Sequence, residues 1–525
     1  MRKEMMTRKT GRFEKGILLL GAVVFSLLYA VCSQIDLNGT VAWTGPDTVL
    51  RFAAAFPVSL LALYGLFQHL MPRCVFRKGR NEKNFCIWLA WGILFCCYVP
   101  MFLIVYPGSF TYDSMTQIAQ IASGQYDAFH PLLHTLMIRA CLSLYGTFQS
   151  MEKCGAVYSL IQMICVSGMF AYVCTAVSRC VSRTAGRCSL AFFALYPAHF
   201  AFASNCTKDV LFSACLACFF ALCFEEIACE ELSAGQRAAR VALGTLACLL
   251  RNNMIYAMVV WVVLLLFVRG KFRRIALCGL LAVVLSLGVN KLLIFALHAD
   301  DGNVREMLSV PMQQLARAKV YAPEAFDEEE SEYLDTLILH EAYKDYYPTI
   351  SDNVKNALDE QAFLSDPVRA AKLWISVGRK CPAVYMDAFL NQAHASLYPY
   401  SRYMHNYAYI DIGSGTALTA PFGLPKINPP ARFEKARVWL HEHFFKNGAD
   451  DQPVLRWIFN TGLIYWILLV HVLYALYCKD WPLVVLFVLP VLLWGTYLLG
   501  PIMYGRYLYP FICLLPMFVL RRRKE

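Results

Sequence analysis

The chain has 525 residues, of which 58% are hydrophobic and only 16% charged, and its mean hydropathy is +0.46. Soluble domains usually carry about a quarter charged residues, so this composition excludes an ordinary soluble enzyme as well as a disordered or collagen-like chain. The net charge is +11, and many of the basic residues lie in clusters between apolar runs. This placement indicates how the chain is oriented in a membrane, and we expect no nucleic acid partner. The 21 cysteines are scattered through apolar runs, so we expect small buried thiols and no disulfide scaffold.

Runs of about 20 apolar residues recur along the chain, each long enough to cross a bilayer as a helix. They lie near 16–34, 48–70, 86–106, 154–177, 188–204, 208–227, 275–297, 456–477, 482–499 and 503–520. The stretch 238–268 is apolar except for Arg251, Asn252 and Asn253, and we interpret it as two short spans meeting at a polar turn. The prediction is an all-α polytopic membrane protein with about twelve transmembrane helices. The apolar segment 131–148 has polar flanks and is interpreted as a helix at the membrane interface.

Basic residues define the orientation, because they concentrate in cytoplasmic connections. The basic clusters lie at 2–15, 73–83, 179–187, 269–274 and 521–524. All of them fall on one side of the membrane only if the segment 131–148 does not cross the bilayer. The exception is 225–240, where four glutamates accompany two arginines. We therefore expect a multi-pass membrane protein with both termini cytoplasmic. The run 16–34 lacks a clear small-residue cleavage site, so a retained anchor is expected rather than a signal peptide.

Three parts follow from this division of the chain. Residues 1–297 form an N-terminal transmembrane domain with an external loop at 107–153, and 456–525 form the last transmembrane helices and a basic tail. Between them, 298–455 is an external, mostly helical domain with 22 acidic and 15 basic residues. Helices are predicted at Glu328–Tyr346 and Pro367–Phe389, and a loop at Asp411–Pro430. The chain contains no GxxxxGK[ST], HExxH or paired CxxC motif, so the sequence does not support a nucleotide motor or a zinc hydrolase.

The external loop 107–153 contains the first candidate for chemistry. Asp113 follows an apolar span, where an aspartate commonly caps a helix. The surrounding polar residues are denser than a cap needs: Tyr112, Ser114, Gln117, His130 and His134. An aspartate partly screened from water at the membrane surface can act as a general base.

Three further breaks in apolar segments present charges on the same predicted face. Lys208 and Asp209 begin a span, and either a structural ion pair or a functional site would explain them. A plain turn explains Asn252 and Asn253, but a turn does not need an arginine. Arg251 is instead suited to bidentate phosphate binding. Arg506, among tyrosines, is either a snorkelling interfacial arginine or a similar ligand. Together these breaks indicate a phosphate-bearing ligand approached from the membrane.

The remaining candidates are weaker. The histidines His130, His134 and His199 match no strong metal-ligand spacing, and His130-Pro131 more readily marks a turn into the interface helix. Gln313 and Arg317 follow the 275–297 span and are expected near the membrane surface, beside the other breaks. The tyrosine-rich stretch 398–409 is interpreted as an interfacial belt, with a sugar platform as the alternative.

These motifs resemble the GT-C superfamily of multipass glycosyltransferases, which includes protein O-mannosyltransferases and aminoarabinose transferases. The matching features are an aspartate in the first large external loop, Asp113, and amphipathic helices after it, within 115–148. The recurring blocks also look like those of an uncharacterised bacterial membrane family placed near GT-C proteins. These blocks are YPGSFTYDSMTQ, FHPLLHT, NCTKD, LLRNN, VPMQQLAR and GPIMYGRYLYP.

The resemblance implies sugar transfer from a polyprenyl-phosphate donor to a cell-envelope glycan, lipid or protein at the external face. It gives Asp113 the role of base or metal-assisting carboxylate, and Arg251 and Arg506 the role of phosphate ligands. The other residues expected to shape the substrate site are Tyr112, Gln117, His130, Lys208, Asp209, Gln313 and Arg317. GT-C loops often place a second acid beside the catalytic one, but here Ser114 follows Asp113. A divalent cation as cofactor therefore stays open.

Two other functions fit the same residues. A flippase or transporter of lipid-linked saccharides could bind phosphate through the arginines without any chemistry at Asp113. Broken helices and repeated halves favour transport; the chain shows a break at Arg251 but no repeated halves. The third alternative is a non-catalytic envelope assembly protein that uses 298–455 for docking.

Overall fold

The structure is a computed structural model. It describes residues 11–72, 75–76, 85–110, 113–228, 232–301, 304–402, 414–428, 430–444, 452, 454–458, 460–519 and 521–522. The described chain is almost entirely helical. Within it, the only sheet is a parallel pair of two-residue strands, β1 (Val75–Phe76) and β2 (Arg521–Arg522).

Among the residues that the structure describes, seven helices are long and apolar enough to cross a membrane, so the chain is an all-α, multi-pass membrane protein. They are α2 (Arg12–Asn38), α3 (Pro46–Gly65) with its continuation η1 (Leu66–Leu70), α4 (Ile87–Ile104), α8 (Met151–Cys180), α11 (Lys208–Ala228), α14 (Lys271–Leu297) and α25 (Trp481–Leu498). Shorter apolar helices occupy other predicted spans: α13 (Asn252–Leu266), α24 (Thr461–Tyr477), and η7 (Gly505–Leu508) with α26 (Tyr509–Val519). The predicted interface segment forms α6 (Leu132–Leu142) and α7 (Tyr145–Phe148).

Two breaks in the apolar helices have clear local causes. α12 (Ala234–Leu250) and α13 meet at Arg251, whose extended backbone (φ −149°, ψ 108°) ends one helix and starts the next, as the sequence predicts. The apolar run 188–204, predicted as one span, is divided into α9 (Arg183–Leu195) and α10 (Pro197–Ala203). Proline disfavours helical backbone in the residue before it, and Tyr196 is extended accordingly.

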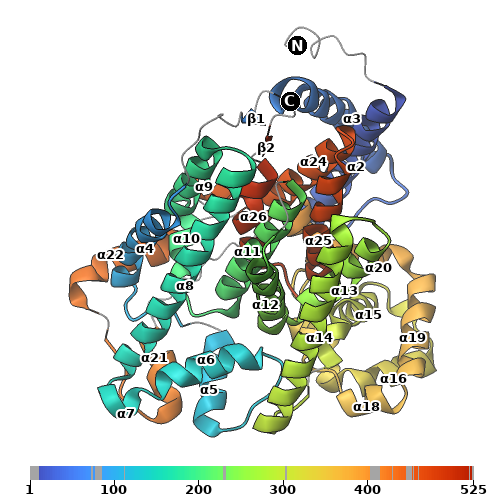
Figure 1. Ribbon diagram of the computed structural model, residues 1–525. Coiled ribbons are helices and arrows are strands. Elements are labelled where there is room, and N and C mark those ends of the chain that lie inside the picture. Colours follow the sequence, from blue (N-terminus) through green and yellow to red (C-terminus); the bar gives the residue numbers. More distant parts are fainter. Residues whose placement is uncertain are drawn as a thin grey trace.

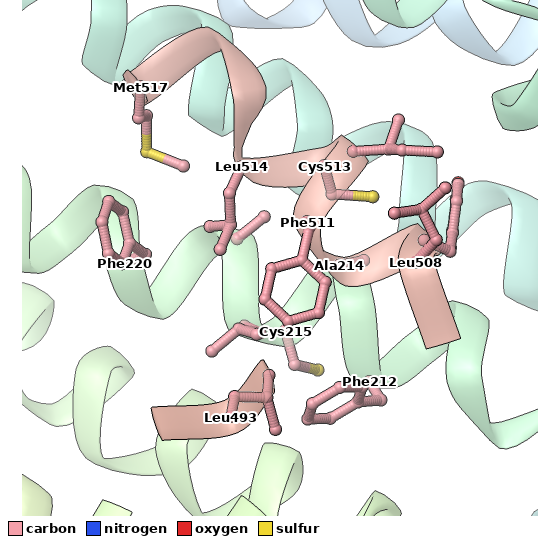
Figure 2. Packing of buried hydrophobic residues seen from close by; sticks show 14 of the residues in the cluster. Phe212, Ala214, Cys215, Phe220, Leu493, Leu508, Phe511, Cys513, Leu514 and Met517 are labelled. Carbon is pink, nitrogen blue, oxygen red and sulfur yellow. The ribbon is translucent and has the colours of Figure 1, made fainter. Parts of the chain in front are cut away.

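Helix α11 forms the centre of the bundle and packs against α8, α12 and α26. Its small residues, including Ala214 and Cys215, let large side chains of α26 approach closely, and Figure 2 shows Phe511 and Leu514 lying against this face. The described cysteines are free thiols and most of them are buried. They therefore act as small apolar side chains that allow dense helix packing.

Part of the hydrophilic segment has a core of its own. We call it the hydrophilic subdomain, residues 304–380. It contains η2 (Val304–Leu308), α15 (Ser309–Tyr321), η3 (Pro323–Ala325), α16 (Glu328–Leu337), η4 (Leu339–Asp345), α17 (Asp352–Lys355), α18 (Glu360–Ser365) and α19 (Pro367–Lys380). Both helices predicted here are shorter than expected. α16 ends at Leu337, and Pro382 starts a new helix, α20 (Pro382–Leu397).

The rest of the hydrophilic segment packs against the apolar helices. The end of α20 joins the main core, and α21 (Ser414–Thr419) and η5 (Ala420–Phe422) pack against α5 (Asp113–Ser123). The remaining helices are η6 (Ala431–Phe433), α22 (Glu434–Phe444) and α23 (Leu455–Ile458). In Figure 1, β1 and β2 lie at the upper end of the bundle, whereas α5, α6 and α7 lie at the lower end.

Candidate functional site

A short backbone pairing places the predicted base beside the predicted lysine. Ser109 pairs in parallel with Asn205: the Ser109 N–H donates to Ser204 O (3.0 Å), and the Cys206 N–H donates to Ser109 O (2.8 Å). Asp113 begins α5 four residues after Ser109, and Lys208 begins α11 three residues after Asn205. The two helices therefore start next to each other.

Gly108 makes this pairing possible. Its φ of +130° lies in a region that side chains with a Cβ rarely adopt. An added Cβ would also collide with Ser159 Oγ on α8 and press against Ser204 O. The sequence signal at this position is the glycine of the YPGSF block, which ends three residues before Asp113.

The two helix starts meet the last helical region in a chain of ion pairs. Asp113 Oδ2 lies 2.9 Å from Lys208 Nζ and 3.0 Å from Arg506 Nη1. Arg506 Nε lies 3.7 Å from Asp209 Oδ2, and Asp209 Oδ1 pairs closely with Arg251 Nη1. We call these five side chains the charge cluster. Asp113 and Arg251 thus converge on one site, through Arg506 and Asp209.

Four members of the charge cluster are buried and Lys208 is partly buried, and the cluster carries one net positive charge, from three cations and two carboxylates. Asp209 is 1% exposed, whereas Asp113, Arg251 and Arg506 are 8–9% exposed. Asp209 lies in the first turn of α11, where the helix dipole favours an anion. Ionisable groups at such depth are costly unless they serve a function or are fully paired.

Tyrosines hold both arginines in place. The Arg251 guanidinium lies 4.8 Å from the Tyr497 ring centre and 4.4 Å from that of Tyr507. Arg506 lies 5.3 Å from the Tyr504 ring centre and 5.2 Å from that of Tyr507. The sequence analysis did not assign these tyrosines to the site, although Tyr504 and Tyr507 flank Arg506 in the same motif. The rings fix the two guanidinium planes while leaving their edges for anions.

The charges around Asp113 and His130 set their protonation. Burial disfavours the Asp113 carboxylate, but Arg506 and Lys208 outweigh burial and hold its pKa well below the usual range. Burial and the neighbouring Lys208 lower the pKa of His130 to about 3. His130 is therefore neutral at ordinary pH, and its Nδ1, 3.2 Å from Lys208 Nζ, accepts a hydrogen bond from the ammonium.

Gln117, predicted to bind substrate, is instead part of a buried polar network. Its amide donates to Thr135 Oγ1 (2.8 Å), and its Oε1 lies 2.8 Å from His134 Nδ1. His134 Nε2 lies 2.7 Å from the Tyr158 hydroxyl. These contacts join α5, α6 and α8, so Gln117 positions the helix that carries Asp113.

Gln313 and Arg317 do not contribute to the charge cluster, contrary to expectation. Gln313 donates to Tyr347 O (2.6 Å) and Pro348 O (3.2 Å), within the hydrophilic subdomain. Arg317 donates to Gly39 O (2.7 Å), after the end of α2, and to the Tyr346 hydroxyl (3.0 Å). Their hydrogen-bonding groups hold the subdomain together and attach it to the bundle. Tyr112 lies outside the described residues.

The hydrophilic subdomain nevertheless packs beside the site. The Ser351 N–H donates to Pro501 O (3.0 Å), five residues before Arg506. Lys355 Nζ lies 5.9 Å from the centre of the Phe129 ring, next to His130. Within the part of the chain that the structure describes, no group of three or more His, Cys, Asp or Glu could hold a metal ion.

Comparison with known proteins adds a family relationship. Residues 125–525 match a family described as "Family of unknown function (DUF6020)". The match contains every charged member of the cluster except Asp113, which lies before it. No curated protein and no solved structure matches the chain. Because the match covers well over half of the sequence, the chain belongs to this family, DUF6020.

Proposed function

We propose that this chain is a GT-C-like glycosyltransferase of the bacterial cell membrane. It would move a sugar from a polyprenyl-phosphate donor to a glycan, lipid or protein of the cell envelope. The observation that carries the proposal is the buried charge cluster, where Asp113 and two arginines meet at helix breaks. The apolar helices indicate that the chain lies in a bilayer, the environment that a polyprenyl tail requires.

In this proposal the cations bind the donor phosphate. Arg251 and Arg506 present planar guanidinium groups, which match two phosphate oxygens at once, and Lys208 adds a point charge. Because the cluster is buried, these interactions are stronger than the same contacts in water. The fixed tyrosine contacts keep the arginines oriented before the donor arrives, which reduces the cost of binding.

Asp113 takes the proton in the transfer step. The acceptor hydroxyl oxygen forms a bond to the anomeric carbon while the bond from that carbon to the phosphate oxygen breaks. The hydroxyl proton passes to the Asp113 carboxylate, and the bonding electrons leave with the polyprenyl phosphate. The added phosphate charge is stabilised by Arg251, Arg506 and Lys208.

The site faces the exterior in this proposal, with 298–455 external and both termini cytoplasmic. The pairing of β1 with β2 supports this orientation. β1 belongs to the basic cluster 73–83 and β2 to the basic cluster 521–524, and the two strands lie at the same end of the bundle (Figure 1). Basic segments concentrate on the cytoplasmic side. Helix α5, which begins at Asp113, lies at the opposite end together with α6 and α7.

A second candidate is a flippase for lipid-linked saccharides. The observation that favours it is the pairing of Asp113 with two cations, which keeps the carboxylate weakly basic. A transporter needs phosphate binding at a broken helix but no base. Chemistry at Asp113 therefore separates the two functions.

The test is transfer of labelled sugar from lipid donor to acceptor in reconstituted membranes. Asp113→Asn keeps the size of the side chain and can still cap α5, but an amide accepts no proton. We expect loss of transfer by about 10²–10⁴-fold. Asp127→Asn is the matched control, because this carboxylate lies in the same connection and bonds to Gln120 and the Phe129 N–H, outside the cluster. Full transfer by Asp113→Asn would reject Asp113 as the base, whereas no transfer by the unmodified chain would reject the enzyme in favour of the transporter.

A further inference from the structure

Every cation that a phosphate would need in the charge cluster is already paired with a carboxylate. Asp113 Oδ2 contacts both Lys208 Nζ and Arg506 Nη1, at 2.9 Å and 3.0 Å. Asp209 pairs with Arg251 and lies near Arg506 Nε. A ligand anion must therefore either share these cations or replace a carboxylate.

The two carboxylates are not held equally. The Asp209 side chain is 1% exposed, lies in the first turn of the long helix α11, and accepts a hydrogen bond from Thr207 Oγ1 (3.3 Å). The Asp113 side chain is 11% exposed and begins α5, which has only eleven residues. Asp209 is thus anchored in the core of the bundle, whereas Asp113 lies at its edge.

We propose that Asp113 is a resident counter-ion that the phosphate of the ligand displaces. Lys208 and Arg506 exchange the Asp113 carboxylate for phosphate oxygens, while Asp209 stays in place and keeps Arg251 oriented. The net positive charge of the cluster attracts the incoming phosphate. When no phosphate is bound, the Asp113 carboxylate compensates the buried charges of Lys208 and Arg506. The inference rests on the proposed function, because the anion is the phosphate of the lipid donor.

Displacement also changes what Asp113 can do. Two adjacent cations stabilise the carboxylate and make it a poor proton acceptor, whereas a neighbouring phosphate anion has the opposite effect. Asp113 would therefore become a competent base only when donor is bound. A carboxylate that accepts no proton until the donor is bound cannot activate water or an acceptor prematurely. Donor binding therefore controls the chemical step.

The test compares the affinity of the purified full-length chain for a C15 prenyl phosphate, measured by calorimetry in one detergent. In Asp113→Asn the competing charge is removed but the volume is kept, so we expect binding about tenfold or more tighter. Asp209→Asn should bind more weakly, because Arg251 loses its anchor. Asp127→Asn, the control outside the cluster, should bind like the unmodified chain.

Equal or weaker binding by Asp113→Asn, with clear binding by the unmodified chain, would overturn displacement and leave the proposed function intact. No binding by the unmodified chain would overturn both. Hydrogen exchange of the unmodified chain gives a second reading that does not depend on a variant. Release of Asp113 should speed amide exchange in the first turns of α5 when prenyl phosphate is added, and unchanged or slower exchange there would contradict the proposal.

Discussion

The guanidinium of Arg251 lies 4.4 Å from the centre of the Tyr507 ring, although the two residues are separated by most of the C-terminal half of the chain. Asp209 holds one edge of the same guanidinium. Arg251 is therefore fixed by an anion at its edge and by an aromatic face, and the same tyrosine also contacts Arg506. Tyr507 is thus a positioning residue shared by both proposed phosphate ligands.

Replacing Tyr507 should weaken phosphate binding only when the aromatic face is lost. Tyr507→Phe keeps the ring, so prenyl phosphate affinity should stay near that of the unmodified chain. Tyr507→Leu removes the cation–π contacts, which are worth about 0.5–2 kcal/mol, and should lower affinity about 2- to 30-fold. Titration of both variants in the same detergent checks this, and equal affinities for Phe and Leu would remove Tyr507 from the site.

A buried ion pair near the other end of α11 should be important for stability. Glu226 and Arg240 pair with both side chains fully buried. Glu226→Gln leaves Arg240 as a buried unpaired charge, which should cost about 3–5 kcal/mol. Glu329→Gln is the control, since Glu329 is 83% exposed and its pair with Arg369 should be worth about 0–1 kcal/mol. Thermal unfolding in one detergent measures both, and similar midpoints would contradict the prediction.

His130 should make the folded chain less stable in mild acid. The pKa of His130 is about 3 in the folded chain, against the ordinary histidine pKa of 6.5. Between these values the unfolded chain binds a proton that the folded chain does not, so stability is lost as pH falls below about 6.5. His130→Gln keeps an acceptor for Lys208 but cannot be protonated. The variant should lose about 2 kcal/mol less stability between about pH 6.5 and 4.5 than the unmodified chain. Parallel pH curves of unfolding free energy would refute this.

The proposed orientation predicts opposite labelling of two cysteines. Cys381 lies between α19 and α20, in the segment proposed to be external, and is partly exposed. Cys478 is exposed in the connection between α24 and α25, on the proposed cytoplasmic side. With single-cysteine variants in intact cells, an impermeant maleimide should label Cys381 and reach Cys478 only after permeabilisation. The reverse pattern would invert the orientation.

The sequence predicts the apolar helices and the charged breaks well, because hydropathy and helix punctuation are local properties. Arg251 illustrates this, since a polar run inside an apolar stretch marked the junction of α12 and α13. The span at 188–204 shows the limit: composition alone did not reveal that Pro197 divides it. Orientation relative to the bilayer also depends on features outside the chain, so it stays a prediction.

The candidate site was only partly predictable for a related reason. Asp113, Lys208, Asp209, Arg251 and Arg506 are charges in apolar surroundings, which is a visible signal, and the structure brings them together. Gln313 and Arg317 carried no such signal, because they were predicted only from their position shortly after the 275–297 span. Their hydrogen-bond partners depend on how the hydrophilic subdomain folds. The tyrosine contacts depend on how α25 and η7 pack, which no local pattern encodes.

The order of the cluster residues along the chain has a consequence for biosynthesis. A ribosome delivers Asp113 first, then Lys208 and Asp209, then Arg251, and it adds Arg506 last of the five. Until η7 and α26 have emerged, the nascent chain lacks the one cation that touches both carboxylates. Before Arg506 is added, Asp113 and Asp209 are balanced by Lys208 and Arg251, so the cluster has no net charge. The cluster therefore gains its attraction for an anion only once Arg506 has been synthesised, and a chain still lacking Arg506 would not compete for the ligand.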